Sequence, residues 1–211
     1  MSLYVCFTMK YFLFAAVLLL FSGCDSLFGT RDAEDPNDDV VRSLWQQPTT
    51  PEIVLVNMSN AFLERNSENY MRCLTDPSVS GRDFLYIPDQ ETAISNPGSF
   101  TEWGLDEERL YINFIFAKSS LPDGALSRLV FTSFEEPSIP SDTALFDEVY
   151  DLQIEHELIN VPTNMRGISR IRMSEDSNGN WSIYRWEDLT FSGEPDTLDL
   201  PTWSEMKARA Q

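Results

Sequence analysis

The sequence contains a single histidine, His156, whose side chain is the one best suited to acid–base chemistry near neutral pH. It lies in segment 145–158, where apolar and acidic residues alternate as they do in a half-buried β-strand. With a period of two residues, His156 shares a face with Tyr150 and Ile154. An imidazole on that face could be a general base assisted by Tyr150 or an arginine, or a hydrogen-bonded residue of the core.

Two arginines, Arg170 and Arg172, share one face of a second predicted strand, 166–174. Paired guanidinium groups can clamp a carboxylate or a phosphate, which makes these residues a candidate ligand site. The alternative is cross-strand pairing with acidic residues such as Asp151 and Glu155. The large excess of acidic residues in the chain favours this second interpretation.

The sequence predicts neither a metal site nor a cofactor. One histidine and no close cysteine pair cannot supply the usual zinc ligands. The run Asp176-x-Asn178-x-Asn180 lacks the glycine and the glutamate that complete a calcium loop, so its Asn-Gly step predicts a hairpin turn. Glycine-rich phosphate loops and nucleophile elbows are also missing.

The composition excludes some partners. The chain has 15 basic and 34 acidic residues, a formal net charge of −19. Binding to nucleic acid needs clustered lysine and arginine, so no nucleic-acid partner is expected. Electrostatic docking on anionic lipid head groups is disfavoured for the same reason.

The beginning of the chain has the pattern of a secretory signal. Lys10 is followed by an apolar run from Tyr11 to Phe21 and then by two small residues. Eleven apolar residues are too few for a membrane-spanning helix, which needs about 20. Residues 1–8 carry no basic side chain, so Met9 is an alternative start of this signal.

The stretch Phe21-Ser22-Gly23-Cys24 resembles the lipobox of bacterial lipoproteins. The resemblance implies cleavage before Cys24 and acylation of its thiol, so that lipid on Cys24 attaches the chain to a membrane of the cell envelope. Residues 1–23 would then be the signal peptide, and the domain would face the periplasm or the exterior. Of the remaining cysteines, Cys73 is expected to be an ordinary buried thiol among apolar neighbours.

Residues 24–50 are predicted to be an acidic tether, with docking of its Leu44-Trp45 patch on the domain left open. A single domain, 51–211, follows. Its first helix begins at Thr50-Pro51-Glu52, where threonine can cap and proline suits the first turn. The other predicted elements are helices at 70–74, within 100–115 and at 203–210, and strands at 83–88, 126–134, 145–158, 166–174 and 181–191.

Helices followed by a long antiparallel sheet indicate an α+β fold. The opening helix pair 50–74, the strand DFLYIP and the hairpin ending NGNWSIYRWEDL resemble the nuclear transport factor 2-like superfamily, with its SnoaL-like members, over residues 50–192. The resemblance implies N-terminal helices packed on a curved antiparallel sheet, cone-like, with a cavity at its open end. Such domains include enzymes with Asp, His or Tyr in the cavity and many non-catalytic binding domains.

The leading prediction is therefore an envelope lipoprotein whose domain binds an envelope protein or a small apolar ligand without catalysis. The alternative is a small-cavity enzyme of the SnoaL-like type in which His156 is the general base.

Overall fold

The computed structural model describes residues 43–133, 135–192 and 200–210. The signal peptide, Cys24 and most of the predicted tether lie outside these residues. The compact unit begins at Ser43, eight residues before the first helix.

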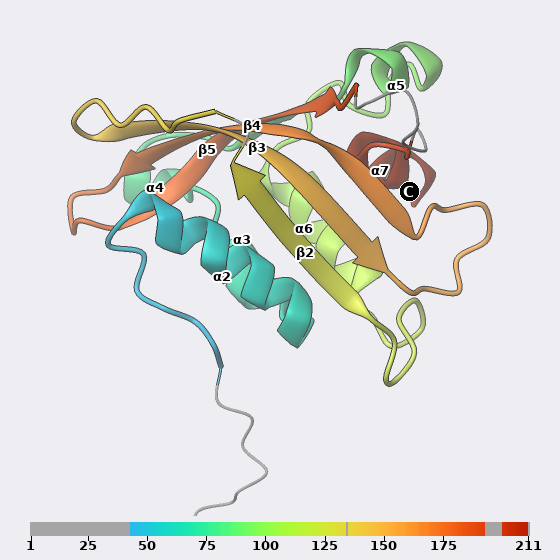
Figure 1. The fold of residues 1–211 in the computed structure, drawn as a ribbon. Coiled ribbons are helices and arrows are strands. Elements are labelled where there is room, and N and C mark those ends of the chain that lie inside the picture. The colour runs from blue at the N-terminus through green and yellow to red at the C-terminus, as the bar shows by residue number, and fades with distance from the viewer. Residues whose placement is uncertain (1–42, 134, 193–199, 211) are drawn as a thin grey trace, which may run out of the picture. The chain divides into compact units, whose positions relative to one another are not determined.

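The centre of the fold is a five-stranded curved sheet in the order β1-β5-β4-β3-β2 (Figure 1). Its long strands are β2 (Ser127–Ser133), β3 (Thr143–Ile154), β4 (Asn164–Glu175) and β5 (Trp181–Thr190), and these four pair with one another in antiparallel fashion. The short β1 (Leu85–Ile87) pairs parallel with β5, so the sheet is mixed rather than wholly antiparallel as predicted. The expected hairpin between β4 and β5 is confirmed, with Gly179 at φ +79° in its turn.

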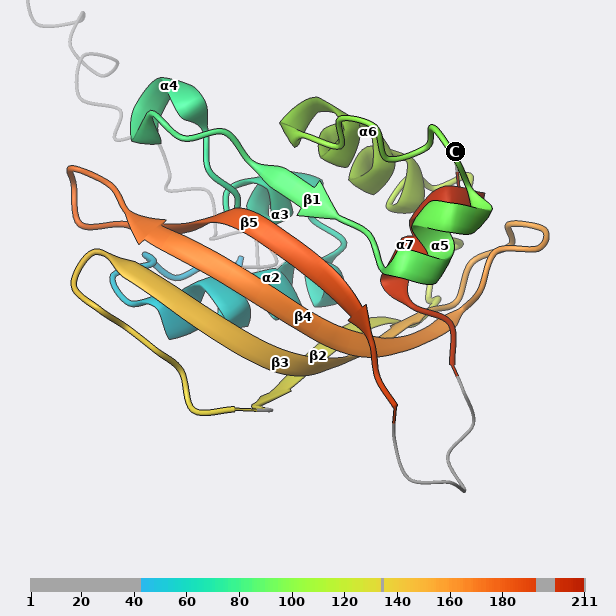
Figure 2. The same cartoon turned by 90° about the horizontal axis from the view of Figure 1, so that it is seen from above.

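The helices α2 (Pro51–Glu64), α3 (Ser67–Met71) and α6 (Leu105–Ile115) gather on one side of the sheet (Figure 2). The first helix begins after Thr50, as the sequence predicts, although the threonine side chain makes no cap hydrogen bond. It ends at Glu64 and is followed by the cap residue Arg65, which has a left-handed conformation with φ 53°. Its buried face, including Val54, Met58 and Phe62, packs against β2 and β5.

Three further helices lie in the part of the chain that the structure describes. Two short ones, α4 (Pro77–Ser80) and α5 (Gln90–Ser95), were not predicted, and each is preceded by an aspartate, Asp76 or Asp89, whose carboxylate caps the first turn. The C-terminal helix α7 (Trp203–Arg209) lies where a final helix was expected and packs against β4.

A bulge in the β4–β5 pair changes which side chains face the core. Arg172 pairs with Arg185, whereas the next residue, Met173, pairs with Ile183. The skipped position reverses the alternation along β5, so Trp181 and Trp186 are both buried, at 6% and 1% exposed. A strict two-residue period would place only one of these tryptophans in the core.

Candidate functional site

A buried carboxylate, Asp188 of β5, lies on the side of the sheet that faces the core and is 1% exposed. Its Oδ1 accepts a hydrogen bond from the Tyr150 hydroxyl at 2.8 Å, and its Oδ2 accepts one from the Tyr86 hydroxyl at 3.1 Å. The Ser204 amide and hydroxyl also donate to Oδ2, at 2.7 and 2.5 Å. Burial raises the pKa of Asp188 to about 6, although the hydrogen bonds from Ser204 and Tyr150 oppose that rise.

Tyr150 reaches Asp188 by lying across Gly167 on the neighbouring strand. A Cβ atom at position 167 would stand 2.5 Å from the Tyr150 hydroxyl oxygen and 2.8 Å from the carbonyl oxygen of Leu189. Glycine is therefore required there by close approach rather than by its backbone angles. The tyrosine also accepts the Trp203 amide at 2.7 Å, which joins β3 to the start of α7.

A second buried carboxylate, Glu108 of α6, pairs with Lys207 of α7. Both side chains are 1% exposed. The carboxylate also accepts hydrogen bonds at 2.6 Å from the Tyr70 hydroxyl and from the Trp103 indole nitrogen. The Lys207 ammonium lies 3.7 Å from the centre of the Tyr86 ring, a cation–π contact that helps to replace its lost hydration.

These two networks hold α7 in the interior of the fold. Its residues Trp203, Ser204 and Met206 are 0% exposed, and Lys207 is 1% exposed. The Trp203 ring packs edge-on against Trp186, with the ring centres 4.8 Å apart. Within the described part of the chain, the space over the inner face of the sheet is thus occupied by the protein's own C-terminal helix.

His156 lies beyond the end of β3, which stops at Ile154 rather than continuing to residue 158 as predicted. The half-buried ring is held by its own loop. Nε2 is 3.0 Å from the Pro162 carbonyl oxygen, and Nδ1 accepts the Leu158 amide at 3.2 Å. A carbonyl oxygen can only accept, so Nε2 carries the proton and the Nδ1 lone pair is already used. No free lone pair remains for a substrate proton in this arrangement.

Tyr150, the other predicted catalytic candidate, has hydrogen-bond partners separate from those of His156. It is 0% exposed, and burial followed by the nearby Asp188 charge raises the pKa of its hydroxyl well above the usual value. The tyrosine therefore stays neutral and serves as a fixed donor to Asp188.

The two arginines predicted to bind a ligand, Arg170 and Arg172, lie beside acidic side chains of the sheet. Arg170 forms a bidentate pair with Asp147 on β3, with N···O distances of 2.9 and 3.0 Å. Arg172 lies 3.9 Å from Glu187, which also accepts the Arg185 Nε at 2.7 Å. This is the cross-strand pairing that the sequence offered as the alternative, although Asp147 and Glu187 were not the acids singled out.

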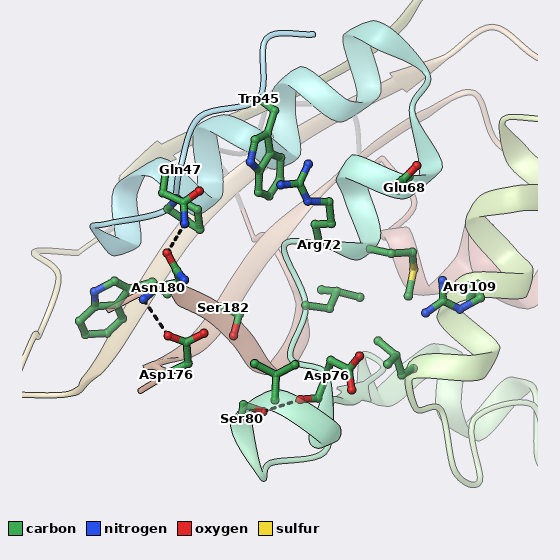
Figure 3. A pocket seen from close by; sticks show the side chains of 16 residues that line it. Trp45, Gln47, Glu68, Arg72, Asp76, Ser80, Arg109, Asp176, Asn180 and Ser182 are labelled. Atoms are coloured by element: carbon green, nitrogen blue, oxygen red, sulfur yellow. Dashed lines mark hydrogen bonds between the residues drawn. The ribbon is translucent and has the colours of Figure 1, made fainter. Parts of the chain in front are cut away.

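A surface pocket of about 330 Å³ lies beside α3, and neither Asp188 nor Glu108 lines it (Figure 3). The segment just before α2 forms one wall. Its Gln46 exchanges two hydrogen bonds with Asn57, at 2.8 and 2.6 Å, and its Pro48 carbonyl oxygen accepts the Trp181 amide at 2.8 Å. The end of the predicted tether, residues 43–50, is therefore docked on the domain.

Two arginines point into this pocket from different elements, Arg72 from the end of α3 and Arg109 from α6 (Figure 3). The Arg72 guanidinium stacks on the Trp45 ring at 3.9 Å and donates to Asn69 at 3.2 Å. Arg109 makes no ion pair with any residue that the structure describes. One signal for this site was present in the sequence, because the apolar Leu44-Trp45 patch ends a tether that is rich in acidic residues.

The described residues contain no group of three or more His, Cys, Asp or Glu side chains placed to hold a metal ion. In this part of the chain, no helix is both long and apolar enough to cross a membrane. The expected buried thiol is found at Cys73, which is 1% exposed.

No protein-family model matches the sequence, and no curated protein matches it either. Similar solved structures include a conserved protein from Planctomyces limnophilus DSM 3776, with 14% identity and a TM-score of 0.50 over 65% of this chain and 91% of that one. An NTF-2 like protein of unknown function from Shewanella oneidensis MR-1 has 17% identity and a TM-score of 0.47 over 67% and 98%. A ketosteroid isomerase-like protein from Erwinia carotovora atroseptica SCRI1043 has 15% identity and a TM-score of 0.46 over 69% and 97%.

Among the similar solved structures are thus nuclear transport factor 2-like and ketosteroid isomerase-like domains. At such identities the likeness concerns the fold alone, so function must come from the residues of this chain.

Proposed function

We propose that this protein is a lipid-anchored lipoprotein of the bacterial cell envelope whose α+β domain binds a ligand or partner without catalysing a reaction. The lipobox-like Phe21-Ser22-Gly23-Cys24 supports the anchor, and the acidic net charge leaves membrane attachment to acyl chains rather than to basic side chains.

The position of α7 is the observation that supports a binding role without catalysis. In an enzyme built on this fold, a substrate would have to reach Asp188, Tyr150 or Glu108 on the inner side of the sheet. Those groups are already hydrogen-bonded to Trp203, Ser204 and Lys207 of α7, and that helix fills the space. A general base must lie within reach of a substrate proton with a lone pair available. The Nδ1 lone pair of His156 already accepts the Leu158 amide, and Asp188 and Glu108 are covered by α7.

Hydrogen exchange distinguishes a permanent core helix from a lid that opens to admit substrate. The amides of Trp203 and Ser204 are buried and donate to Tyr150 and Asp188 at 2.7 Å. We expect them to exchange as slowly in NMR measurements as the amides of the central strand β4, because both should require global unfolding. Exchange many-fold faster than that of β4 under native conditions would mean that α7 opens locally, and would favour the alternative of a small-cavity enzyme of the SnoaL-like type.

The anchor is tested by replacing Cys24 with serine. Without the thiol no acyl chain can be attached, so we expect the protein to move from the membrane pellet to the soluble fraction on fractionation. Cys73→Ala is the matched control. Cys73 is buried in the domain, so its replacement should not change how the protein divides between the membrane pellet and the soluble fraction. Retention of the Cys24→Ser chain on membranes would contradict lipid anchoring.

A further inference from the structure

We infer that the surface pocket between α3, α6 and the docked segment 43–48 binds the carboxylate of a small apolar acid, with Arg109 and Arg72 as its two cationic contacts. The inference rests on the proposed function only for the source of the ligand, since an anchored protein works beside a bilayer that holds such acids. The pocket itself is defined by contacts within the domain.

Arg109 is the first cationic group of the pocket. In a chain with 34 acidic residues, most of the described arginines have a carboxylate or carbonyl partner. Arg109 lines a concave site and has no such partner in the described regions. Its charge reaches Asp76, where hydrogen bonds from Ser78 lower the carboxyl pKa and Arg109 lowers it further. A guanidinium left with its donors available in a pocket is suited to an incoming anion.

Arg72 is the second cationic group, and its guanidinium is held in place before any ligand arrives. Stacking on Trp45 fixes the plane of the Arg72 guanidinium, and the hydrogen bond to Asn69 uses one of its terminal nitrogens. Stacked arginine retains its in-plane donors, and an ordered side chain loses less conformational entropy on binding.

Three acidic side chains also line the pocket, and two of them accept hydrogen bonds within their own turns. Asp76 caps α4 by accepting the Ser78 amide and hydroxyl, at 2.8 and 2.6 Å. Asp176 closes the β4–β5 turn by accepting the Asn178 and Asn180 amides, at 2.7 and 3.0 Å. The hydrogen bonds do not remove the charges of Asp76 and Asp176, so a ligand carboxylate must contact the two arginines directly and stay apart from all three acids.

The rest of the pocket suits an apolar chain of limited length. Its volume of about 330 Å³ is at the low end of the ~300–1,000 Å³ typical of small-molecule sites. Much of the lining is apolar, including Trp45, Pro48, Met71, Leu74, Leu105 and Trp181. A ligand with one anionic end and a short hydrocarbon body matches this combination.

The test is calorimetric titration of the full chain carrying Cys24→Ser with octanoate below its micelle concentration. We expect saturable binding of octanoate, with octanol and acetate each binding at least about tenfold more weakly, since each lacks one half of the recognised structure. Equal binding of octanol would overturn the role of the arginines. Lack of saturable octanoate binding would overturn the pocket assignment.

Two substitutions locate the binding. Arg109→Gln and Arg72→Gln are each expected to weaken octanoate binding about tenfold, the factor that corresponds to ~1.4 kcal/mol. Arg128→Gln is the matched control, because Arg128 is an exposed arginine of β2 that does not line the pocket. Unchanged octanoate binding by the Arg72/Arg109 double variant, with unfolding like that of the parent, would overturn the inference. Cys24-dependent membrane attachment is measured separately, so failure of the pocket and failure of the proposed function give different results.

Discussion

Replacing Lys207 with methionine is expected to lower the free energy of unfolding by about 3–5 kcal/mol, because it leaves the Glu108 carboxylate buried without its cation. The hydrogen bonds from Tyr70 and Trp103 would remain, but two neutral donors do not replace an ammonium group. The loss is a large fraction of the stability of a typical domain, ~5–15 kcal/mol. Equilibrium unfolding in urea at pH 7 measures it.

The double variant Glu108→Gln/Lys207→Met separates loss of the ion pair from loss of packing. A glutamine carbonyl can accept the Trp103 indole N–H while its amide donates to the Tyr70 oxygen, so the double variant should be more stable than Lys207→Met alone. Lys118→Met, an exposed lysine, is the control and should change stability by less than ~0.5 kcal/mol. A loss below ~1 kcal/mol for Lys207→Met would show that α7 does not depend on this pair.

Much of the fold follows from local sequence pattern. The apolar spacing of Val54, Met58 and Phe62 predicts α2, and the turn signals around Asn178-Gly179 predict the β4–β5 hairpin. Such elements are encoded by residues close together in the chain, so a periodic pattern is sufficient to recognise them.

Elements that depend on distant partners could not be predicted in the same way. The parallel pairing of Tyr86 with Trp186 joins two residues far apart in the sequence, and no local pattern specifies the direction of such a pair. The bulge that buries both Trp181 and Trp186 is likewise a property of two strands together.

The interior networks were missed for a related reason. Asp188 and Lys207 have the sequence character of surface residues, because charged side chains are almost never fully buried unless they are paired. Their partners, Tyr150 and Glu108, come from other elements far along the chain. The strand prediction was wrong at residues 155–158. Their alternation of polar and apolar residues suggested a strand that includes His156, but β3 ends at Ile154.

The surface pocket depends on the same long-range assembly. Arg72 and Arg109 are separated in the chain by α4, β1 and α5, and Trp45 belongs to a segment that the composition assigns to the tether. Only the packed structure brings these three residues to one cavity.

Protonated Asp188 is expected to stabilise the folded protein at low pH, so the free energy of unfolding should fall as the pH rises from about 4 to 7. Asp188→Asn should remove this fall. The folded state raises the pKa of this carboxyl group from 3.8 to about 6, chiefly through burial, so it binds the proton more tightly than the unfolded chain does. The contribution is fully present below pH 3.8 and is lost as the pH rises through about 6. A shift of this size corresponds to about 2–3 kcal/mol across that interval.

Urea unfolding of both proteins at several pH values measures this contribution as the difference between the two curves, in which other titrating groups cancel. The variant's asparagine has a single carbonyl oxygen, so it cannot accept both from Tyr150, which bonds Oδ1 of Asp188, and from Ser204 and Tyr86, which bond Oδ2. The variant should therefore be less stable throughout, but its curve should lack the decline assigned to Asp188. Asp123→Asn, in an exposed turn, controls for the loss of one acidic group. Parallel curves for the wild type and Asp188→Asn would mean that Asp188 does not bind its proton more tightly in the folded protein, and the donors around it would then have to outweigh the cost of its burial.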